Sequence, residues 1–203
     1  MTDSLLIVFT KNLVEGKVKT RLAKSIGDRA ALQVYTLLLE HTKSITADLN
    51  FNTRVGYSEY ADDKDTWNIS EVSKFIQQGS DLGERMKQAF EEGFKDGFRK
   101  VILIGGDCFN LKSRHLKAAF DALDDKNFVF GPALDGGYYL IGMRYMYEQL
   151  FQNKSWGTDT VLKDTLEDLK DEAVFLLEPL NDIDTLEDLK ACQPLLNQIE
   201  LND

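Results

Sequence analysis

Residues 100–111, KVILIGGDCFNL, are the stretch that decides the fold of this sequence. After Lys100 the run VILIG (101–105) is apolar, which is typical of a central strand in a buried sheet. Two glycines and Asp107 follow directly, so this carboxylate should stand at the carboxyl end of the strand with open space beside it. A helical pattern begins at about residue 111. A strand that leads into a helix in this way predicts one unit of an α/β fold.

The same alternation continues in both directions along the chain. Strands are predicted at 4–10, 51–58, 73–78, 127–131, 138–143 and 173–178, and helices at 28–48, 81–94, 111–123, about 159–170 and from about 184 onward. Alternation of this kind predicts an α/β fold with a mostly parallel sheet, which binds ligands at the carboxyl ends of its strands. Because the chain has 203 residues, only three prolines and no linker-like stretch, we expect a single domain over residues 1–203.

The composition is that of an acidic globular protein. A formal net charge of −10 argues against general binding to nucleic acids or anionic membranes, both of which need positive charge. The two cysteines, Cys108 and Cys192, are far apart and form neither a disulfide framework nor a zinc-site spacing, which fits the cytoplasm. No apolar run is long enough for a membrane span. We therefore expect a cytoplasmic protein whose ligands are small molecules.

A basic cluster follows the first predicted strand, in KNLVEGKVKTRL (11–22). Gly16 allows close approach of the backbone to a ligand, and Lys19 and Arg21 carry positive charge near the start of a helix. Helix amides and basic side chains together bind phosphate, although the spacing is not that of a P-loop. In a chain of net charge −10 this cluster predicts a phosphate-binding loop. A solvated basic loop is the alternative.

Two acidic segments follow two other predicted strands. Asp107 ends the central strand, while Asp182 and Asp184 lie in NDIDTLEDL (181–189) after the last strand. Carboxylate oxygens are ligands that Mg²⁺ or Mn²⁺ prefers, and these ions bridge phosphates. The alternative is helix capping, by Asp107 for the helix that follows it and by Asp184 with Glu187 three residues on.

The heptapeptide DTLEDLK occurs twice, at 164–170 and at 184–190. A single repeat of seven residues does not indicate a repeat protein. Only the second copy directly follows a predicted strand, so Asp184 and not Asp164 is the candidate ligand.

A glycine-rich connection lies in QQGSDLGERM (77–86). Gly79, Asp81 and Gly83 make a flexible entry into a helix, and Arg85 projects from its first turn. Backbone groups in such a loop can read the edge of a nucleobase. A plain turn from strand to helix is the alternative.

A second glycine-rich turn lies in GPALDGGYYLIG (131–142), between two apolar runs. Asp-Gly is a strong hairpin signal, because glycine tolerates positive φ and aspartate caps its own turn. The other interpretation is a lip where Asp135 and the backbone of Gly136 and Gly137 approach a ligand.

Five segments, in this order, resemble one family: GKVKTRL, QGSDLGERM, IGGDC, GPALDGGYYLIG and DIDTLEDL. Over nearly its whole length, from LLIVFTK to DIDTLEDLK, the chain is similar to bacterial glycosyltransferase-like proteins of the radical-SAM/selenodomain-associated transferase type. These belong to the nucleotide-diphospho-sugar transferase superfamily with its GT-A type Rossmann-like fold. The resemblance implies a mostly parallel central sheet with helices on both faces and an active site at its carboxyl edge. It also favours the ligand lip over a mere turn at Asp135.

The resemblance further implies roles for single residues. Nucleotide or phosphate binding falls to Lys11, Gly16, Lys19, Arg21, Gly79, Asp81, Gly83 and Arg85. Asp107 and Asp184 are implied to bind Mg²⁺ or Mn²⁺, and Asp107 and Asp135 to be catalytic. Asp135, Gly136 and Gly137 are implied to line the sugar or acceptor pocket.

The implied activity is that of a metal-dependent transferase with a nucleotide-activated donor. Glycosyl transfer from a nucleotide-sugar to a small acceptor is the expected reaction. Two alternatives stay open, namely guanylyl or cytidylyl transfer from a nucleoside triphosphate to a phosphorylated acceptor, and nucleotide binding without catalysis. The last is suggested by Leu13 and by Phe109 after the metal aspartate, where the family usually carries prolines. The fold alone does not choose among these reactions.

Overall fold

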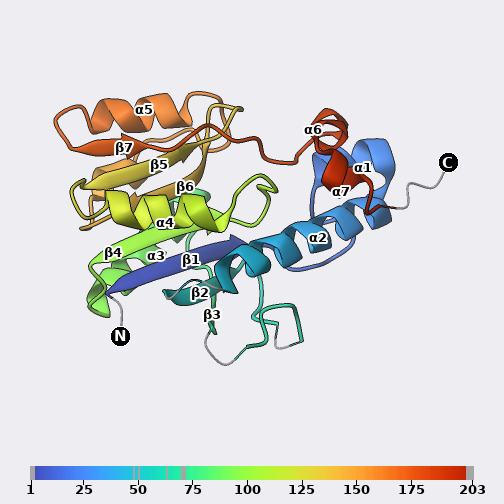
Figure 1. Cartoon of the computed structure of the whole chain (residues 1–203), viewed down its shortest axis with the longest axis horizontal. Coiled ribbons are helices and arrows are strands. Elements are labelled where there is room, and N and C mark those ends of the chain that lie inside the picture. Colours follow the sequence, from blue (N-terminus) through green and yellow to red (C-terminus); the bar gives the residue numbers. More distant parts are fainter. Residues whose placement is uncertain (1–2, 48, 50, 63, 70–71, 200–203) are drawn as a thin grey trace.

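The computed structural model describes residues 3–47, 49, 51–62, 64–69 and 72–199. Within these residues seven strands form one sheet, in the order β3-β2-β1-β4-β6-β5-β7 (Figure 1). The strands are β1 (Ser4–Thr10), β2 (Asn52–Tyr57), β3 (Val72–Ile76), β4 (Lys100–Gly105), β5 (Phe128–Pro132), β6 (Tyr138–Met143) and β7 (Val174–Leu176). Neighbours run parallel except that β6 is antiparallel to β4 and β5. The predicted mostly parallel α/β sheet is confirmed.

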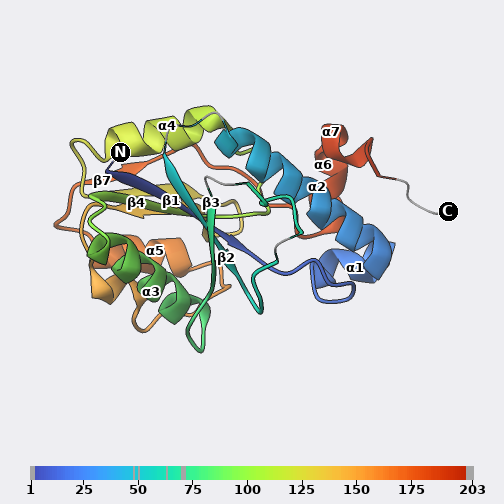
Figure 2. The same cartoon turned by 90° about the horizontal axis from the view of Figure 1, so that it is seen from below.

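Helices cover both faces of this sheet. They are α1 (Thr20–Ile26), α2 (Asp28–Ala47), α3 (Leu82–Lys95), α4 (Ser113–Ala122), α5 (Val161–Asp168), α6 (Leu186–Ala191) and α7 (Gln193–Leu196), with a 3-10 helix η1 (Glu148–Phe151). Helix α4 and the end of α2 pack on one face, whereas α3, α5 and η1 pack on the other (Figures 1 and 2). The single helix predicted from about residue 184 is in fact two, because Pro194 in the first turn of α7 has no backbone N–H with which to continue α6.

The central strand β1 explains why the sheet is buried on both sides. All seven of its residues are buried, and side chains along a strand alternate between faces. Leu6 and Val8 join the cluster under α4, while Leu5 and Ile7 join the cluster under α3. An uninterrupted apolar run is therefore required at this place in the sheet.

A third apolar cluster lies outside the two sheet faces. It joins α1, the first part of α2, α6 and α7 through side chains such as Leu22, Val34, Leu38, Leu189 and Leu195. Figure 2 shows these helices together at one end of the molecule. We call this group of helices the terminal lobe. It brings segments from both ends of the chain to the carboxyl edge of the sheet.

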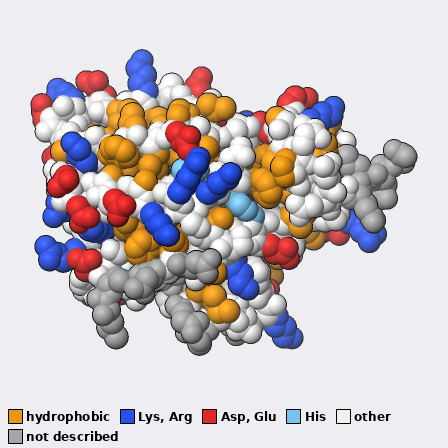
Figure 3. All heavy atoms as spheres, viewed as in Figure 1, with side chains coloured by type: hydrophobic (Ala, Val, Ile, Leu, Met, Phe, Trp, Pro, Cys, Tyr) orange, Lys and Arg blue, Asp and Glu red, His pale blue; other side chains and the backbone are white. Residues whose placement is uncertain are grey.

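The surface over α4 and α2 carries acidic, basic and hydrophobic side chains interspersed with one another (Figure 3). The net charge of −10 does not appear on this face as one continuous acidic field. Among the helices that the structure describes, none has the length and apolarity needed to cross a bilayer.

The connection between β5 and β6 is a tight turn that contacts the start of α5. The Asp135 carboxylate accepts the backbone N–H of Gly137 at 2.9 Å. Gly136 has a φ of 90°, and its carbonyl accepts the N–H of Leu162 at 3.0 Å. The hairpin interpretation of this stretch is therefore correct for its backbone, and the turn is fixed against α5.

We predict that Gly136→Ala lowers the free energy of unfolding by at least about 2 kcal/mol more than Gly157→Ala does. Both glycines have positive φ, 90° and 80°, so both substitutions carry similar backbone strain. A Cβ at Gly136 would lie 2.1 Å from the Asp159 carbonyl oxygen, whereas nothing lies within 4 Å of one at Gly157. Urea denaturation of the two variants measures the difference. Equal losses would show that the turn can leave α5 without cost.

Candidate functional site

A cleft of about 680 Å³ opens at the carboxyl edge of the sheet. Thr10 and Lys11 reach it from the end of β1, Gln77 from the end of β3, and Gly106 and Asp107 from the end of β4. Residues that follow three different strands therefore meet at one edge, as expected for a parallel sheet.

Lys19 lies at the centre of the charged part of this cleft. Its Nζ atom is 3.0 Å from Asp107 Oδ2 and 2.7 Å from Asp184 Oδ1, and its side chain is only 5% exposed. Arg21 Nη1 lies 3.5 Å from Asp184 Oδ2. The basic loop and both acidic segments thus converge on one nitrogen atom. The two carboxylates lie as close together as the metal hypothesis requires, but a lysine ammonium stands between them.

The backbone of Lys19 is itself unusual. It adopts the left-handed conformation, with φ and ψ both 45°, immediately before α1 begins. A residue other than glycine in this region costs about 1–3 kcal/mol and persists only where its surroundings fix it. The two ion pairs of the buried ammonium supply that constraint.

The charges in this cluster shift one another's protonation. Burial by itself lowers the pKa of Lys19, but the charges of Asp107 and Asp184 outweigh it and hold the pKa above its ordinary value. Burial acts to raise the pKa of Asp107, yet Lys19, and more weakly Lys11, keep that pKa below its usual range. Lys19 and Asp107 are therefore both ionised at neutral pH.

Two glycines give Asp107 its position. A Cβ at Gly105 would lie 2.8 Å from Asp107 Oδ1, and a Cβ at Gly106 would lie 2.6 Å from Leu39 of α2. The Asp107 carbonyl accepts the N–H of Ile183 at 3.1 Å, which ties the exit of β4 to the segment that carries Asp184. The capping alternative for Asp107 is wrong, because the N-cap of α4 is Lys112.

The capping alternative for Asp184 is also wrong. The N-cap of α6 is Thr185, whose hydroxyl accepts the N–H of Asp188 while the Asp188 carboxylate accepts the N–H of Thr185. Glu187 takes no part in this capping box. Because its neighbour caps the helix, the Asp184 side chain is available to Lys19.

Asp182 belongs to the site as well; the sequence offered it with Asp184 as a candidate carboxylate, but the implied set of site residues did not include it. It lines the cleft beside Asp184, and its Oδ1 atom is buried with no hydrogen-bond partner among the described residues. Burial, and then the charge of Asp107, raise the pKa of Asp182 to about 8. Its carboxyl group can therefore hold a proton near neutral pH, as a general acid must. The signal was present, since residues two apart in an extended segment share a side, and Ile183 between them is buried.

The segment 79–85 contributes two side chains to the cleft. Asp81 caps α3 by accepting the N–H of Glu84 at 2.9 Å, and Arg85 Nε donates to the Gly79 carbonyl at 3.2 Å. Both side chains also line the cleft. Gly79 and Gly83 do not line the cleft. Gly79 instead supplies a positive φ to the loop, and Gly83 packs against the indole ring of Trp156.

Four further predicted residues do not line the cleft: Gly16, Asp135, Gly136 and Gly137. Gly16 provides a positive φ in the loop before α1, and the other three form the turn described above. Asp135 nevertheless lies close enough to Asp182 for its charge to contribute to the raised pKa there. Its predicted contact with a transferred group stays a prediction.

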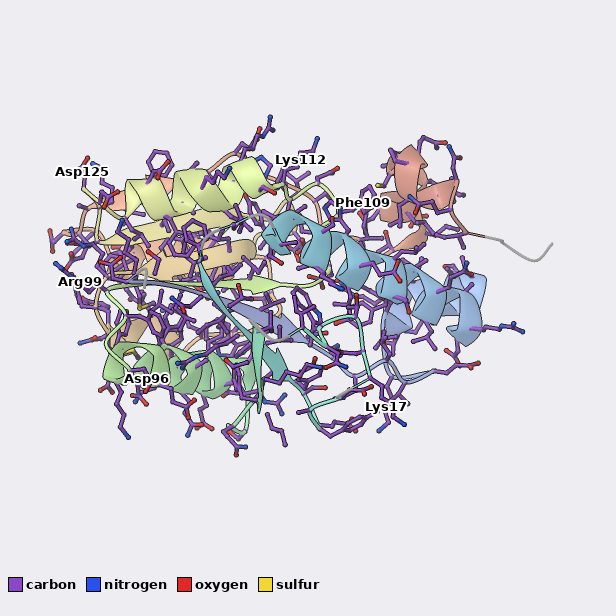
Figure 4. The ribbon with its side chains drawn as sticks, turned by 60° about the horizontal axis from the view of Figure 1, so that its bottom comes forward. Lys17, Asp96, Arg99, Phe109, Lys112 and Asp125 are labelled. Carbon is purple, nitrogen blue, oxygen red and sulfur yellow. The ribbon has the colours of Figure 1, made fainter. Side chains whose placement is uncertain are left out.

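Leu13 and Phe109, where the family usually carries prolines, both pack against the terminal lobe. The rings of Phe109 and His41 lie 4.6 Å apart. Figure 4 shows Phe109 and Lys17 on opposite sides of α2. These two departures therefore have a packing role in the lobe that carries Lys19.

Residues 42–158 match a family described as uncharacterized proteins conserved in bacteria, DUF2064. The chain belongs to the DUF2064 family. A crystal structure from Desulfovibrio desulfuricans G20, assigned to the nucleotide-diphospho-sugar transferases, matches 95% of this chain and 87% of its own, with 32% identity and a TM-score of 0.89. These findings confirm the superfamily that the sequence motifs indicated.

Two more distant structures share the fold of this DUF2064 protein. A cytidylyltransferase from Leptospira borgpetersenii serovar Hardjo-bovis (strain JB197) has a TM-score of 0.63 at 17% identity, over 98% of this chain and 88% of its own. The 4-diphosphocytidyl-2C-methyl-D-erythritol synthase of Anaerococcus prevotii DSM 20548 has a TM-score of 0.63 at 10% identity, over 97% and 96%. At these identities the likeness concerns the fold alone. No curated protein matches the chain.

We predict that Lys19→Met costs the DUF2064 protein about 2 kcal/mol of unfolding free energy at pH 7, below the 3–5 kcal/mol of a fully buried pair. The discount is needed because the two carboxylates are 39% and 40% exposed. In the wild type, the lowered pKa of Asp107 gives a stability contribution that is present above the unfolded pKa of about 4 and lost as the pH falls through the folded pKa. Without Lys19, burial raises the pKa of Asp107, so the folded variant is stabilised when this carboxyl group takes up a proton. The loss of unfolding free energy in Lys19→Met should therefore be smaller at pH 5 than at pH 7.

Urea denaturation at pH 5, 6 and 7 in metal-free buffer measures this change. Lys17→Met is the matched control, because Lys17 pairs with Glu59 at 3.2 Å while both side chains stay half exposed or more. It should cost less than about 1 kcal/mol at every pH. A deficit in Lys19→Met that is the same at pH 5 and pH 7 would contradict the prediction.

Proposed function

We propose that this DUF2064 protein transfers a glycosyl group from a nucleotide-sugar to a small-molecule acceptor, with a divalent cation bound by Asp107 and Asp184. The observation that carries the proposal is the convergence of Lys19 with these two carboxylates at the carboxyl edge of the sheet. The relative from Desulfovibrio desulfuricans, assigned to the nucleotide-diphospho-sugar transferases, supports the choice of donor.

Basic side chains on one side of the cleft suit the phosphates of such a donor. Lys11 and Arg21 line the cleft beside Lys19, in a chain of net charge −10. The Arg21 side chain is 69% exposed, and its guanidinium keeps donors free beyond its contact with Asp184. A planar guanidinium fork suits phosphate oxygens, and charge-assisted hydrogen bonds to them are stronger than neutral ones.

The donor set also fits a hard divalent cation. Carboxylate oxygens suit Mg²⁺ and Mn²⁺, and Asp107 and Asp184 already share one cationic nitrogen atom, so this point attracts positive charge. Within the described ranges no group of three or more His, Cys, Asp or Glu side chains is arranged to hold a metal. That suits Mg²⁺, which often takes one or two carboxylates and completes its shell with water and phosphate. A bound ion would neutralise the diphosphate leaving group.

The protein's own groups then have separate tasks. Lys11, Lys19 and Arg21 orient and neutralise the diphosphate as negative charge develops on it. Asp182 lies beside the charged cluster with a pKa raised to about 8, and its ionised form can accept the proton that an acceptor hydroxyl loses as the new bond to the sugar forms. Asp135, whose charge acts on Asp182, is proposed to contact the transferred group or the acceptor.

Nucleotidyl transfer to a phosphorylated acceptor is the second candidate, favoured by the fold shared with two cytidylyl-transferring enzymes. Incubation with Mn²⁺ and a panel of small acceptors, both hydroxyl-bearing and phosphorylated, together with either nucleotide-sugars or nucleoside triphosphates, separates the two reactions. Release of nucleoside diphosphate supports glycosyl transfer, whereas release of pyrophosphate supports nucleotidyl transfer. Binding without either product would support the non-catalytic interpretation and overturn the proposal.

We predict that Asp184→Asn and Asp107→Asn each weaken metal-dependent binding of a nucleoside diphosphate by at least about tenfold, the effect of losing one interaction with a charged group. Thermal shift with the diphosphate, with and without Mn²⁺, measures this loss. Asp164→Asn is the control, because Asp164 occupies the first position of the other DTLEDLK copy and accepts a hydrogen bond from Thr160, the N-cap of α5. It should bind as the wild type does. An equal loss in Asp164→Asn would show a general effect of charge instead of a site.

A further inference from the structure

Lys19 contacts one oxygen atom of each carboxylate that is proposed to bind the cation. Its Nζ atom donates to Asp107 Oδ2 at 3.0 Å and to Asp184 Oδ1 at 2.7 Å. Oxygen atoms that both lie so close to one nitrogen atom need only a small movement to share an ion at about 2.1 Å. The Lys19 ammonium and a divalent cation therefore require the same two oxygen atoms.

The second oxygen of each carboxylate is also engaged. Asp184 Oδ2 faces Arg21 Nη1 at 3.5 Å. Asp107 Oδ1 lies against Gly105 at the end of β4, so close that a Cβ at Gly105 would be 2.8 Å away. A cation that used these oxygens would meet a guanidinium group at one and the strand backbone at the other. The ammonium and the cation are therefore alternative partners of the two carboxylates.

The charges around Lys19 are close to balance before any divalent ion is added. The two carboxylates face two cations, the Lys19 ammonium and the Arg21 guanidinium. Lys11 adds a positive charge that acts on Asp107, and Asp182 adds a carboxyl group that is mostly protonated at pH 7. A divalent ion that bound alone would leave an ammonium group with a 5% exposed side chain without its partners. An unpaired buried charge is strongly unfavourable, because it has lost its hydration.

A diphosphate changes this balance, since it brings negative charge of its own. Lys11 and Arg21 line the cleft beside Lys19 and can hold the diphosphate there. Lysine carries its ammonium on a long flexible stem, so Nζ can turn from the carboxylates to phosphate oxygens while the backbone before α1 stays in place. The ammonium then keeps anionic partners, and the released carboxylate oxygens suit a divalent cation.

We propose that Lys19 competes with a divalent cation for Asp107 and Asp184, and that binding of a diphosphate to the Lys19 ammonium makes these carboxylates available to the cation. The inference rests on the proposed function, because it requires both a cation site and a diphosphate in the cleft. It makes the binding of cation and diphosphate cooperative, and by linkage each raises the affinity for the other equally. The protein then selects the cation–diphosphate complex over the free ion.

Mn²⁺ alone tests the competition at pH 7. Water proton relaxation measures its binding, because the enhancement rises when Mn²⁺ tumbles with the protein. In Lys19→Met the carboxylates have lost the ammonium, so Mn²⁺ should bind at least about tenfold more tightly than to the wild type. Lys17→Met is the matched control, since it removes the same charge from the same loop, at a side chain that is 59% exposed and pairs with Glu59. It should bind Mn²⁺ as the wild type does.

A double variant shows where the additional Mn²⁺ binds. Lys19→Met combined with Asp184→Asn should lose the tenfold gain, because one of the two carboxylates is gone. A gain that persists in the double variant would overturn the inference, since the ion would then bind away from the carboxylates that Lys19 contacts.

A measurement on the unaltered protein makes the test independent of the folding of any variant. Inorganic pyrophosphate is the probe, and its complexes with Mn²⁺ that are free in solution tumble too fast to give the enhancement. The wild type should bind Mn²⁺ weakly in the absence of pyrophosphate and at least about tenfold more tightly in its presence.

Two results would overturn the competition while leaving the proposed function intact. One is equally tight binding of Mn²⁺ alone by the wild type and by folded Lys19→Met. The other is tight binding of Mn²⁺ by the wild type that pyrophosphate does not strengthen. If Mn²⁺ binds neither to the wild type with pyrophosphate nor to Lys19→Met, the cation site itself is wrong, and the proposed function falls together with the role of Lys19.

Discussion

The ammonium group of Lys19 is the constraint on which the rest of the site depends. A buried cation is tolerated only where carboxylates compensate for its lost hydration, and here Asp107 and Asp184 both do so. The backbone of Lys19 is left-handed before α1, and a hydrogen bond from Ile183 to the Asp107 carbonyl joins the exit of β4 to the segment before α6, so both carboxylates reach the same ammonium group. The same three charges are the ones that a diphosphate and its counter-ion would redistribute.

The central strands could be predicted from the sequence. Burial on both faces of the sheet demands long apolar runs, such as those of β1 and β4. Asp107 and Asp184 could be predicted to meet because parallel strands end at one edge of a sheet. Their contact with Lys19 could not, since a basic loop gives no sign of whether its lysine points to solvent or to a carboxylate. The choice between Asp184 and Thr185 as helix cap also depends on tertiary contacts, because both side chains favour that position.

The glycines show why local motifs identify a site better than they assign roles within it. Gly105 and Gly106 leave room for Asp107, as the sequence indicated. Gly79, Gly83 and Gly136 instead serve the backbone and the packing around the cleft, since each would bring a Cβ against a backbone atom or an indole ring. A motif that combines glycines with charged residues near a strand end locates the cleft, but only the packing separates residues that contact a ligand from those that shape the chain.

The pairing of Lys19 with Asp184 spans 165 positions of sequence. During synthesis the loop after β1 leaves the ribosome well before Asp184, which is made 165 residues later than Lys19. Until then Lys19 lacks one of its two carboxylates, and the terminal lobe lacks α6 and α7. Contacts of such separation form late in folding because loop closure must come first. A nascent chain that ends before Asp184 lacks one wall of the charged cleft even if most of its sheet has folded, so the segment that carries Asp184 decides when the cleft is complete.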